Sequence, residues 1–185
     1  GMVIGDVAGK GAAAAFYMAE IKGALQSLPA RYTSPGQVLV ELNRFIRRHF
    51  DKQTFVTMIY AIYQPDGRRV CFARAGHLPL GVLREKKVEW HRPDGVGLGL
   101  MASEILEKKM PEKTLRLKPG NTLFLYTDGL IEARNPQKED YGEEALTRLL
   151  NGVKHQNLKQ IFQEIRNSMR AFVSDGPRLD DMTAV

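Results

Sequence analysis

Aspartates at the ends of apolar strands are the residues of this sequence best placed to do chemistry. Asp6 follows an apolar strand end and precedes a glycine-rich turn, and Asp128 follows the apolar run "TLFLYT". Asp180 and Asp181 stand just before a final strand. Carboxylate oxygens are hard ligands that suit Mg²⁺ or Mn²⁺ better than zinc. An isolated aspartate is more often a turn or cap residue, so it is their shared position that predicts a divalent-metal site.

The turn "GDVAGKG" offers a competing interpretation, a phosphate-binding loop. Such a loop needs G-x-x-x-x-G-K-[ST], but the spacing from Gly5 to Gly9-Lys10 is one residue short, and Gly11 stands where the magnesium-binding Ser or Thr belongs. The G-x-G-x-x-G dinucleotide pattern is also absent from this turn. We therefore interpret the glycines as residues that bend the backbone between strand and helix, which leaves Asp6 as the functional residue.

The elements that must position these aspartates follow from hydrophobic periodicity and turn residues. We expect strands at 2–5, 54–64, 68–76, 78–85 and 86–92, with a hairpin turn at 65–67, and a second hairpin over 113–129 around Pro119-Gly120. We expect helices at 10–28, after the Ser34-Pro35 start signal, at 141–153 and at 157–174. The first helix is predicted to have one broad apolar face, made of Phe16, Ala19, Ile21, Ala24, Leu25 and Leu28.

The order of these elements predicts an α+β fold. Helices come first, hairpin-linked strands follow, and helices return at the end, so the pattern is not an alternating βα repeat. The strands at 54–63 and 121–127 are apolar on both faces and need covering on both sides. These features predict a four-layer α-β-β-α sandwich of two antiparallel sheets. No linker divides residues 1–185, and we expect one domain, a fragment of a longer protein whose first strands are missing.

Composition and charge exclude fewer classes of function than the motifs do. The chain has 185 residues and a formal net charge of +6 from 27 basic and 21 acidic residues, and the basic residues are dispersed. Solvated faces explain this charge better than a nucleic-acid surface, which stays as a weaker alternative. The single cysteine, Cys71, lies in an apolar strand; it indicates an inert thiol and a reducing cytoplasm.

A set of ordered segments resembles the bacterial, SpoIIE/RsbU-type branch of the metal-dependent type 2C protein phosphatases. The matching segments are "IGDVAGKGAAAAFYMA" (4–19), "TFVTMIYAIY" (54–63), "ARAGHLPLGVL" (73–83), "GVGLGL" (95–100), "LKPGNTLFLYTDGLIEARN" (117–135), "YGEEAL" (141–146) and "DDMT" (180–183). No single segment is decisive, but their order is specific to the family and covers nearly the whole chain.

The resemblance implies the same sandwich and a site for two Mn²⁺ or Mg²⁺ ions. Asp6 matches the aspartate that bridges both metals, and Val7 matches the position whose backbone carbonyl binds one of them. Asp128 and Asp180 match the carboxylates of the second metal, while Asp181 is expected to be a poorer ligand. By this resemblance Asp6, Asp128 and Asp180 are the catalytic residues.

The implied activity is hydrolysis of phosphoserine or phosphothreonine in a protein. Two cations would activate a water that attacks phosphorus in line, without a covalent phosphoenzyme. The family's usual substrate is a phosphorylated anti-sigma-factor antagonist. Members of the family commonly carry a sensor or receiver module in the parent chain, and the resemblance allows for a parent chain that is membrane-anchored. The open sheet edge is the expected contact of a homodimer.

Two departures from the family pattern bear on this prediction. The family's G-D-x-Y-[DS] segment, which supplies an acid and a strand, would precede residue 1, so the alternative of a catalytically silent signalling or binding domain stays open. The phosphate-binding arginine and general-acid histidine of the eukaryotic branch have no match. His77, in "AGHLPL", is expected to pin its turn by hydrogen bonding rather than to act in catalysis.

Overall fold

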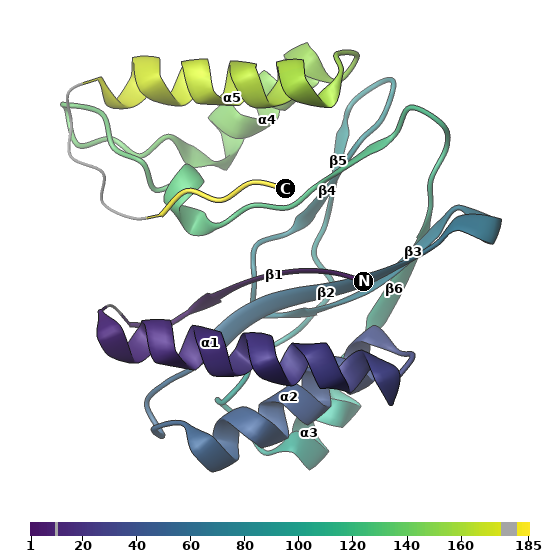
Figure 1. The fold of residues 1–185 in the computed structure, drawn as a ribbon. Helices are drawn as coiled ribbons and strands as arrows, with labels where there is room; N and C mark the ends of the chain where they lie inside the picture. The colour runs from purple at the N-terminus through teal and green to yellow at the C-terminus, as the bar shows by residue number, and fades with distance from the viewer. Residues whose placement is uncertain (10, 175–180) are drawn as a thin grey trace. The chain divides into compact units, whose positions relative to one another are not determined.

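A computed structural model of the chain shows a mixed helical and stranded fold (Figure 1). The structure describes residues 1–9, 11–174 and 181–185. These form two compact units: unit 1 comprises Gly1–His77 and Arg92–Leu117, and unit 2 comprises Leu78–His91 and Lys118–Val185. Each unit has its own antiparallel sheet and its own hydrophobic core.

The sheet of unit 1 has four strands in the order β1-β2-β3-β6, and all neighbouring strands are antiparallel. The strands are β1 (Met2–Val7), β2 (Val56–Gln64), β3 (Arg69–Ala75) and β6 (Glu112–Arg116). A 3₁₀ turn at Pro65–Gly67 joins β2 to β3, which confirms the predicted hairpin.

Three helices belong to unit 1, namely α1 (Ala12–Ser27), α2 (Pro35–His49) and α3 (Ser103–Lys108). Figure 1 shows α1 and α2 on the same side of the sheet. The predicted start of α2 is confirmed, since the Ser34 side chain accepts a hydrogen bond from the Gln37 amide and Pro35 occupies the first turn. Helix α3, which has six residues and no side-chain cap, was not predicted.

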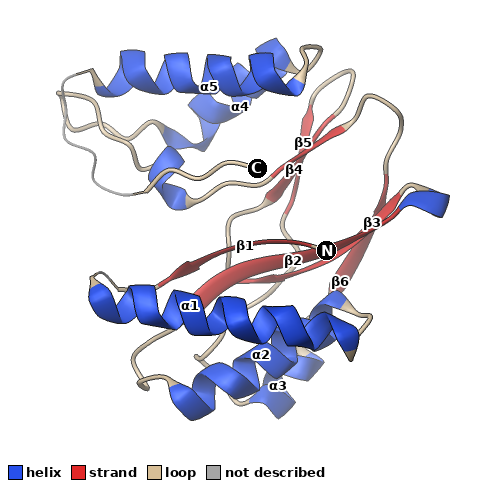
Figure 2. Ribbon diagram, in the orientation of Figure 1, coloured by secondary structure: helices blue, strands red, loops and turns tan. Residues whose placement is uncertain are grey.

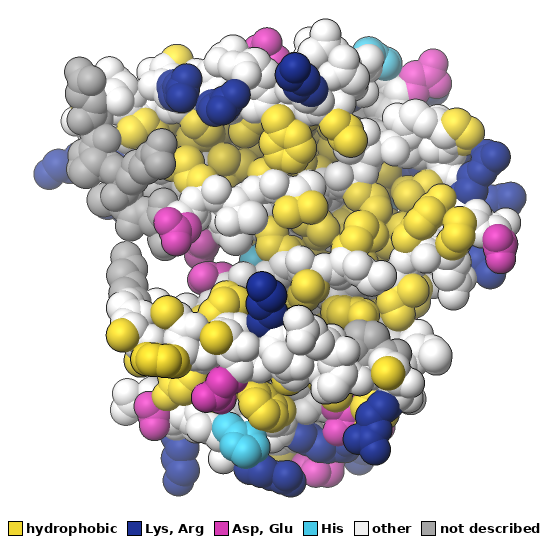
Figure 3. All heavy atoms as spheres, viewed as in Figure 1, with side chains coloured by type: hydrophobic (Ala, Val, Ile, Leu, Met, Phe, Trp, Pro, Cys, Tyr) yellow, Lys and Arg dark blue, Asp and Glu magenta, His cyan; other side chains and the backbone are white. Residues whose placement is uncertain are grey.

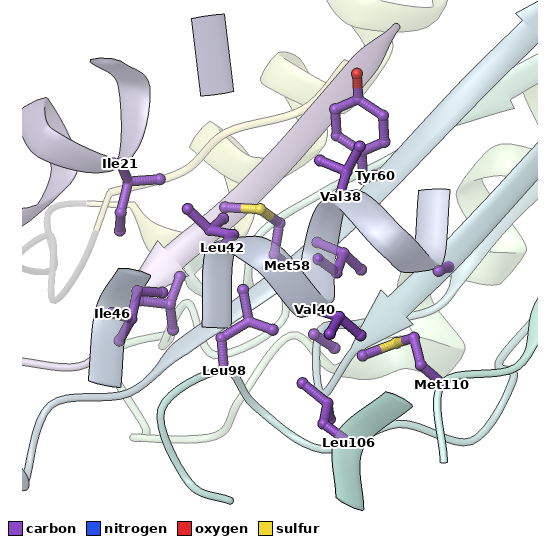
Figure 4. Packing of buried hydrophobic residues seen from close by; sticks show 14 of the residues in the cluster. Ile21, Val38, Val40, Leu42, Ile46, Met58, Tyr60, Leu98, Leu106 and Met110 are labelled. Carbon is purple, nitrogen blue, oxygen red and sulfur yellow. The ribbon is translucent and has the colours of Figure 1, made fainter. Parts of the chain in front are cut away.

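The core of unit 1 lies between these helices and one face of the sheet. Strand residues Val7, Val56, Met58 and Tyr60 pack there with α1 and α2 residues. Figure 4 shows part of this cluster, with Ile21, Leu42 and Met58 among the labelled side chains. Because side chains alternate along a strand, the intervening residues of β1 and β2 project to the opposite face, and Asp6 is one of them.

The predicted apolar face of α1 is only partly correct. Ile21 is buried, but Phe16 is 69% exposed and Ala19 is exposed. The residues that pack on the core are Ala14, Tyr17, Ile21, Ala24, Leu25 and Leu28. They form one stripe at helical spacing, and Phe16 and Ala19 lie beside it, so hydrophobic side chains reach the surface over α1 (Figure 3).

Unit 2 contains a three-stranded antiparallel sheet, in the order β5-β4-β7, and two helices. Its elements are β4 (Leu80–Leu83), β5 (Val88–His91), β7 (Thr122–Phe124), α4 (Gly142–Val153) and α5 (Leu158–Val173), which Figure 2 colours by type. Asn157 and Gln160 form a reciprocal capping box that starts α5. Leu146 and Leu150 of α4 and Ile161 and Ile165 of α5 join the unit's core.

The predicted hairpin over 113–129 is wrong. The turn itself exists, because the Asn121 amide bonds to the Lys118 carbonyl and Gly120 has φ +83°. However, β6 before the turn pairs with β3, whereas β7 after it pairs with β4 in the other sheet. The turn residues were read correctly, but the strands on either side find better partners elsewhere in the chain.

The predicted fold class is confirmed. The chain is an α+β protein with two antiparallel sheets flanked by helices. Among the described residues, no helix is both long and apolar enough to cross a membrane.

Candidate metal centre

Asp6 occupies a defined position on β1. It lies directly opposite Thr57 of β2 in the antiparallel register. The next residue pair, Val7 and Val56, belongs to the helix-side core, so Asp6 and Thr57 share the other face of the sheet. The Asp6 side chain is exposed, and a carboxylate in this position is accessible to a cation.

Val7 offers a second oxygen on the same strand. Its cross-strand neighbour, Val56, bonds to Leu98 through both backbone groups. The Val56 amide donates to the Leu98 carbonyl at 2.9 Å, and the Val56 carbonyl accepts from the Leu98 amide at 2.8 Å. The Ala8 amide bonds to the Phe55 carbonyl at 2.9 Å. Alternate residues of an antiparallel strand direct their backbone groups to opposite edges. The Val7 carbonyl therefore points away from β2, toward the outer edge of β1.

The glycines after Val7 are required by backbone conformation rather than by space. Gly9 has φ +115° and Gly11 has φ +84°, and a Cβ at either position would meet nothing within 4 Å. Positive φ is the region that favours glycine. The pair turns the chain from β1 into α1 and leaves the carboxylate and carbonyl at the strand's end. Lys10, between them, lies outside the described residues.

Asp128 stands at the corresponding place in unit 2, after β7 and at the start of a 3₁₀ turn, Asp128–Leu130. Its Oδ1 accepts a hydrogen bond of 3.0 Å from the Gly129 amide. Its backbone carbonyl accepts the amides of Ile131 and Glu132. The turn therefore fixes the Asp128 backbone and holds one carboxylate oxygen, as an oriented ligand requires.

The backbone of the C-terminal segment lies beside Asp128. The Thr127 amide bonds to the Thr183 carbonyl at 3.0 Å, and the Thr127 hydroxyl donates to the Asp181 carbonyl at 3.2 Å. The backbone at Asp181 thus lies next to Thr127, the residue before Asp128. Asp180, the predicted ligand, lies outside the described residues.

The predicted ligands therefore fall into two groups. Asp6 and Val7 are adjacent in unit 1, and Asp128 and Asp181 belong to unit 2, where Thr127 bonds to the Asp181 carbonyl. Within residues 1–9, 11–174 and 181–185, no three His, Cys, Asp or Glu side chains form a group that could hold a metal ion. The donors that the structure does describe are all hard oxygens, which fits Mg²⁺ or Mn²⁺.

His77 and Thr57 form a contact that the sequence pattern did not predict. The His77 ring is buried, and its Nδ1 lies 2.8 Å from the Thr57 hydroxyl. The His77 carbonyl accepts a 2.6 Å hydrogen bond from Arg74, so the expected hydrogen bonding at this turn is present. The signal for Thr57 was the one threonine within the largely apolar run "FVTMIYAIY", but its significance depends on strand register.

Two other charged or reactive groups have ordinary structural explanations. Burial, and then the nearby Arg92, lower the pKa of Arg74, which also bonds to the Pro93 carbonyl at 2.7 Å. Burial raises the pKa of the half-buried Cys71 thiol, so this cysteine is not an activated nucleophile. Lys and Arg side chains are scattered over the face shown in Figure 3, rather than gathered in one patch.

Solved structures define the class of fold. The SiaA-PP2C domain of Pseudomonas aeruginosa superimposes with a TM-score of 0.82 at 20% identity, and the match covers 98% of this chain and 71% of that one. RsbX in complex with magnesium superimposes with a TM-score of 0.65 at 16% identity, covering 98% and 77% of the two chains. The fold is that of the PP2C-type phosphatases.

The sequence identifies the family within that class. Residues 1–185 match the family described as Stage II sporulation protein E (SpoIIE), and the chain belongs to this family. It is 36% identical over 133 residues to "Phosphoserine phosphatase RsbU" of Bacillus subtilis (strain 168), a match that covers 72% of this chain. The chain spans 39% of the length of RsbU. The resemblance to the SpoIIE/RsbU branch is thus confirmed.

Proposed function

We propose that this chain is a metal-dependent protein serine/threonine phosphatase domain. The observation that carries the proposal is the arrangement on β1, where the Asp6 carboxylate projects from one face and the Val7 carbonyl points to the outer strand edge. Two oxygen donors on consecutive residues, at the position that the family uses for metal, fit a divalent cation. Membership in the SpoIIE family supports the same conclusion.

The residues proposed to hold two ions are those predicted from the sequence. Asp6 would bridge them, the Val7 carbonyl would bind one, and Asp128 and Asp180 would bind the other. The all-oxygen donor set and the magnesium present in the RsbX structure support Mg²⁺ or Mn²⁺. When bound, the ions supply positive charge for the phosphate oxygens and a water of lowered pKa.

The chain's own residues position the reacting groups. The positive-φ glycines Gly9 and Gly11 turn the chain from β1 into α1, and a phosphate would approach Asp6 at this end of the strand. The Gly129 amide holds Asp128 Oδ1 at 3.0 Å, and Oδ2 of the same carboxylate would bind the ion. In this proposal the Asp6 and Asp128 carboxylates act as ligands rather than as nucleophiles, and the leaving serine or threonine oxygen takes its proton from water.

The substrate, partners and location follow from the family rather than from the geometry. We propose a phosphorylated protein of the anti-sigma-factor antagonist type as the substrate, and a sensor or receiver module in the parent chain as the regulator. Residues 1–185 would act as one catalytic domain, since the family match extends over both units. We propose that this domain works in the cytoplasm.

The direct test is hydrolysis of p-nitrophenyl phosphate by this chain with and without Mn²⁺. We expect activity that EDTA abolishes and that Asp128→Asn lowers at least about 100-fold. Asp66→Asn, in the exposed turn between β2 and β3, is the matched control and should retain full activity. Activity that is insensitive to EDTA or to Asp128→Asn contradicts the proposal. A chain that takes up no Mn²⁺ supports the silent-domain alternative.

A further inference from the structure

Three polar side chains line up across neighbouring strands of unit 1. Asp6 lies on β1, Thr57 on β2, and His77 follows β3, in the order in which these strands neighbour one another. The other residues of β1 and β2 on this face are apolar, for example the directly opposed pair Ile4 and Ile59. Thr57 is half-buried and His77 is buried, and polar side chains removed from water are costly unless they are hydrogen-bonded, so the contacts within this row need an explanation.

The first contact in this row follows from strand register. Asp6 and Thr57 are direct cross-strand partners, and directly opposed residues have Cβ atoms roughly 4.5–5.5 Å apart. At that separation the Thr57 hydroxyl is within reach of the Asp6 carboxylate. Both side chains are short and have few rotamers, so few side-chain conformations would separate the carboxylate from the hydroxyl.

The second contact is observed directly, and the histidine that makes it is held in place. His77 Nδ1 lies 2.8 Å from Thr57 Oγ1. The preceding residue, Gly76, has φ +68°, and a Cβ there would approach the Gly97 amide nitrogen to 2.8 Å. The Arg74 guanidinium bonds to the His77 carbonyl. The turn that carries His77 is therefore tightly fixed, and so is the position of its ring.

Hydrogen-bond chemistry determines which group in this row donates and which accepts. An ionised carboxylate can only accept, while a threonine hydroxyl has one proton and two lone pairs. If Thr57 gave its proton to His77, its lone pairs would face the Asp6 carboxylate. The favourable arrangement has His77 Nδ1–H donating to Thr57 Oγ1, and Thr57 Oγ1–H donating to Asp6.

We propose that Thr57, held by His77, is a positioning residue that orients the Asp6 carboxylate for metal binding. The proposal rests on the proposed function, because it assumes that Asp6 is a metal ligand. Groups that hydrogen-bond a metal-ligating side chain commonly change metal affinity about 10- to 100-fold when they are removed. Thr57 would act in this way, through Asp6 and without touching the substrate.

The first arm of the test needs no metal. Long-range ¹H–¹⁵N correlation spectra of the chain, recorded well above the ordinary histidine pKa of about 6.5, report which ring nitrogen carries the proton. Comparison with His77→Asn assigns the signal among the chain's 4 histidines. We expect the Nδ1–H form in the wild-type chain and a shift toward the Nε2–H form in Thr57→Val. A wild-type His77 in the Nε2–H form overturns the proposed direction of the hydrogen bonds.

The second arm measures Mn²⁺ affinity by calorimetry. Thr57→Val preserves the shape of the side chain and removes the hydroxyl, whereas Thr57→Ser keeps the hydroxyl. We expect Thr57→Val to weaken Mn²⁺ binding about 10- to 100-fold and Thr57→Ser to stay within about threefold of the wild-type affinity. Thr147→Val, at a half-buried threonine of unit 2, is the matched control and should bind as the wild type does. Thermal melting of each variant confirms that it is folded.

The outcomes separate this inference from the proposed function. If Asp6→Asn binds Mn²⁺ as tightly as the wild-type chain, or the wild-type chain binds none, the proposed function is contradicted, together with any role for Thr57 in metal binding. If Asp6→Asn loses the metal while a folded Thr57→Val keeps the wild-type affinity, only the positioning role is contradicted.

Discussion

Replacing the buried Asn43 by alanine is predicted to loosen the loop that borders the end of β2. Asn43 lies on α2 and is 0% exposed. Its Nδ2 donates to the Met101 carbonyl at 3.1 Å and to the Ser103 hydroxyl at 2.7 Å, and its Oδ1 accepts the Gly99 amide at 2.7 Å. One side chain therefore anchors three points of the segment between Gly99 and Ser103.

The magnitude follows from these three hydrogen bonds. Each contributes about 1 kcal/mol net to stability, and buried groups left without a partner cost more, so Asn43→Ala should destabilise this region by about 3 kcal/mol. A local loss of that size corresponds to a rise of about 150-fold in the rate of protected amide exchange, at about 1.4 kcal/mol per factor of ten. The Gly99 amide, which bonds to Asn43 itself, should show the largest change.

Hydrogen exchange followed by mass spectrometry measures this effect without assuming two-state unfolding. Peptides that cover residues 94–103 should exchange faster in Asn43→Ala, and peptides from α5 in unit 2 should be unchanged. Asn167→Ala, at an exposed asparagine of α5 whose Oδ1 accepts a hydrogen bond from Gln163, is the control and should alter neither region. Protection of the 94–103 segment that changes less than about threefold in Asn43→Ala would refute the reasoning.

Three further predictions concern backbone strain, pH and thiol reactivity. Gly76→Ala should destabilise the chain by about 2 kcal/mol or more in urea unfolding, because φ +68° is strained for alanine and the new Cβ would lie 2.8 Å from the Gly97 amide; an unchanged midpoint would contradict this. The hydrogen bond from Arg84 lowers the pKa of Glu89 in the folded chain. The pair therefore stabilises the fold by about 0.5 kcal/mol when the pH is above the unfolded glutamate pKa of about 4.3. This stabilisation is lost as the pH falls through the lower pKa of Glu89 in the folded chain. Unfolding of Arg84→Gln should lack that part of the acid dependence, and identical pH profiles would exclude it. Because burial raises the pKa of Cys71, iodoacetamide should alkylate the folded chain at least about tenfold more slowly than the urea-unfolded chain; equal rates would show an exposed thiolate.

Local signals in the sequence were sufficient for most helices and strands. Ser34 and Pro35 announce the start of α2 through cap chemistry. The run of β-branched and aromatic residues in β2 and the Pro65–Gly67 turn predict the first hairpin. These features act within a few residues, so their interpretation needs no knowledge of the rest of the fold.

Features that depend on distant partners were not predictable. The turn around Gly120 is real, but the pairing of β6 with β3 and of β7 with β4 is decided by strands tens of residues away. Phe16 was assigned to the wrong face because α1 is apolar nearly all round, and its amphipathic pattern is correspondingly weak.

The candidate site shows the same division. Asp6 and Asp128 could be chosen because each follows an apolar strand, Asp6 before a glycine-rich turn and Asp128 directly before a glycine. Thr57 could not, because its importance comes from lying opposite Asp6 and beside His77, which only the register of β1 on β2 determines. The direction of the Val7 carbonyl likewise depends on the bond between Val56 and Leu98.

The measurement that tests the central claim most directly is phosphate release from a serine-phosphorylated protein of the anti-sigma-factor antagonist type. The wild-type chain and Asp6→Asn are compared at saturating Mn²⁺ and in the presence of EDTA. We predict Mn²⁺-dependent release by the wild-type chain and a loss of at least about 100-fold in Asp6→Asn. Equal rates for the two proteins, or release by the wild-type chain that persists in EDTA, would contradict a metal-dependent phosphatase built on Asp6.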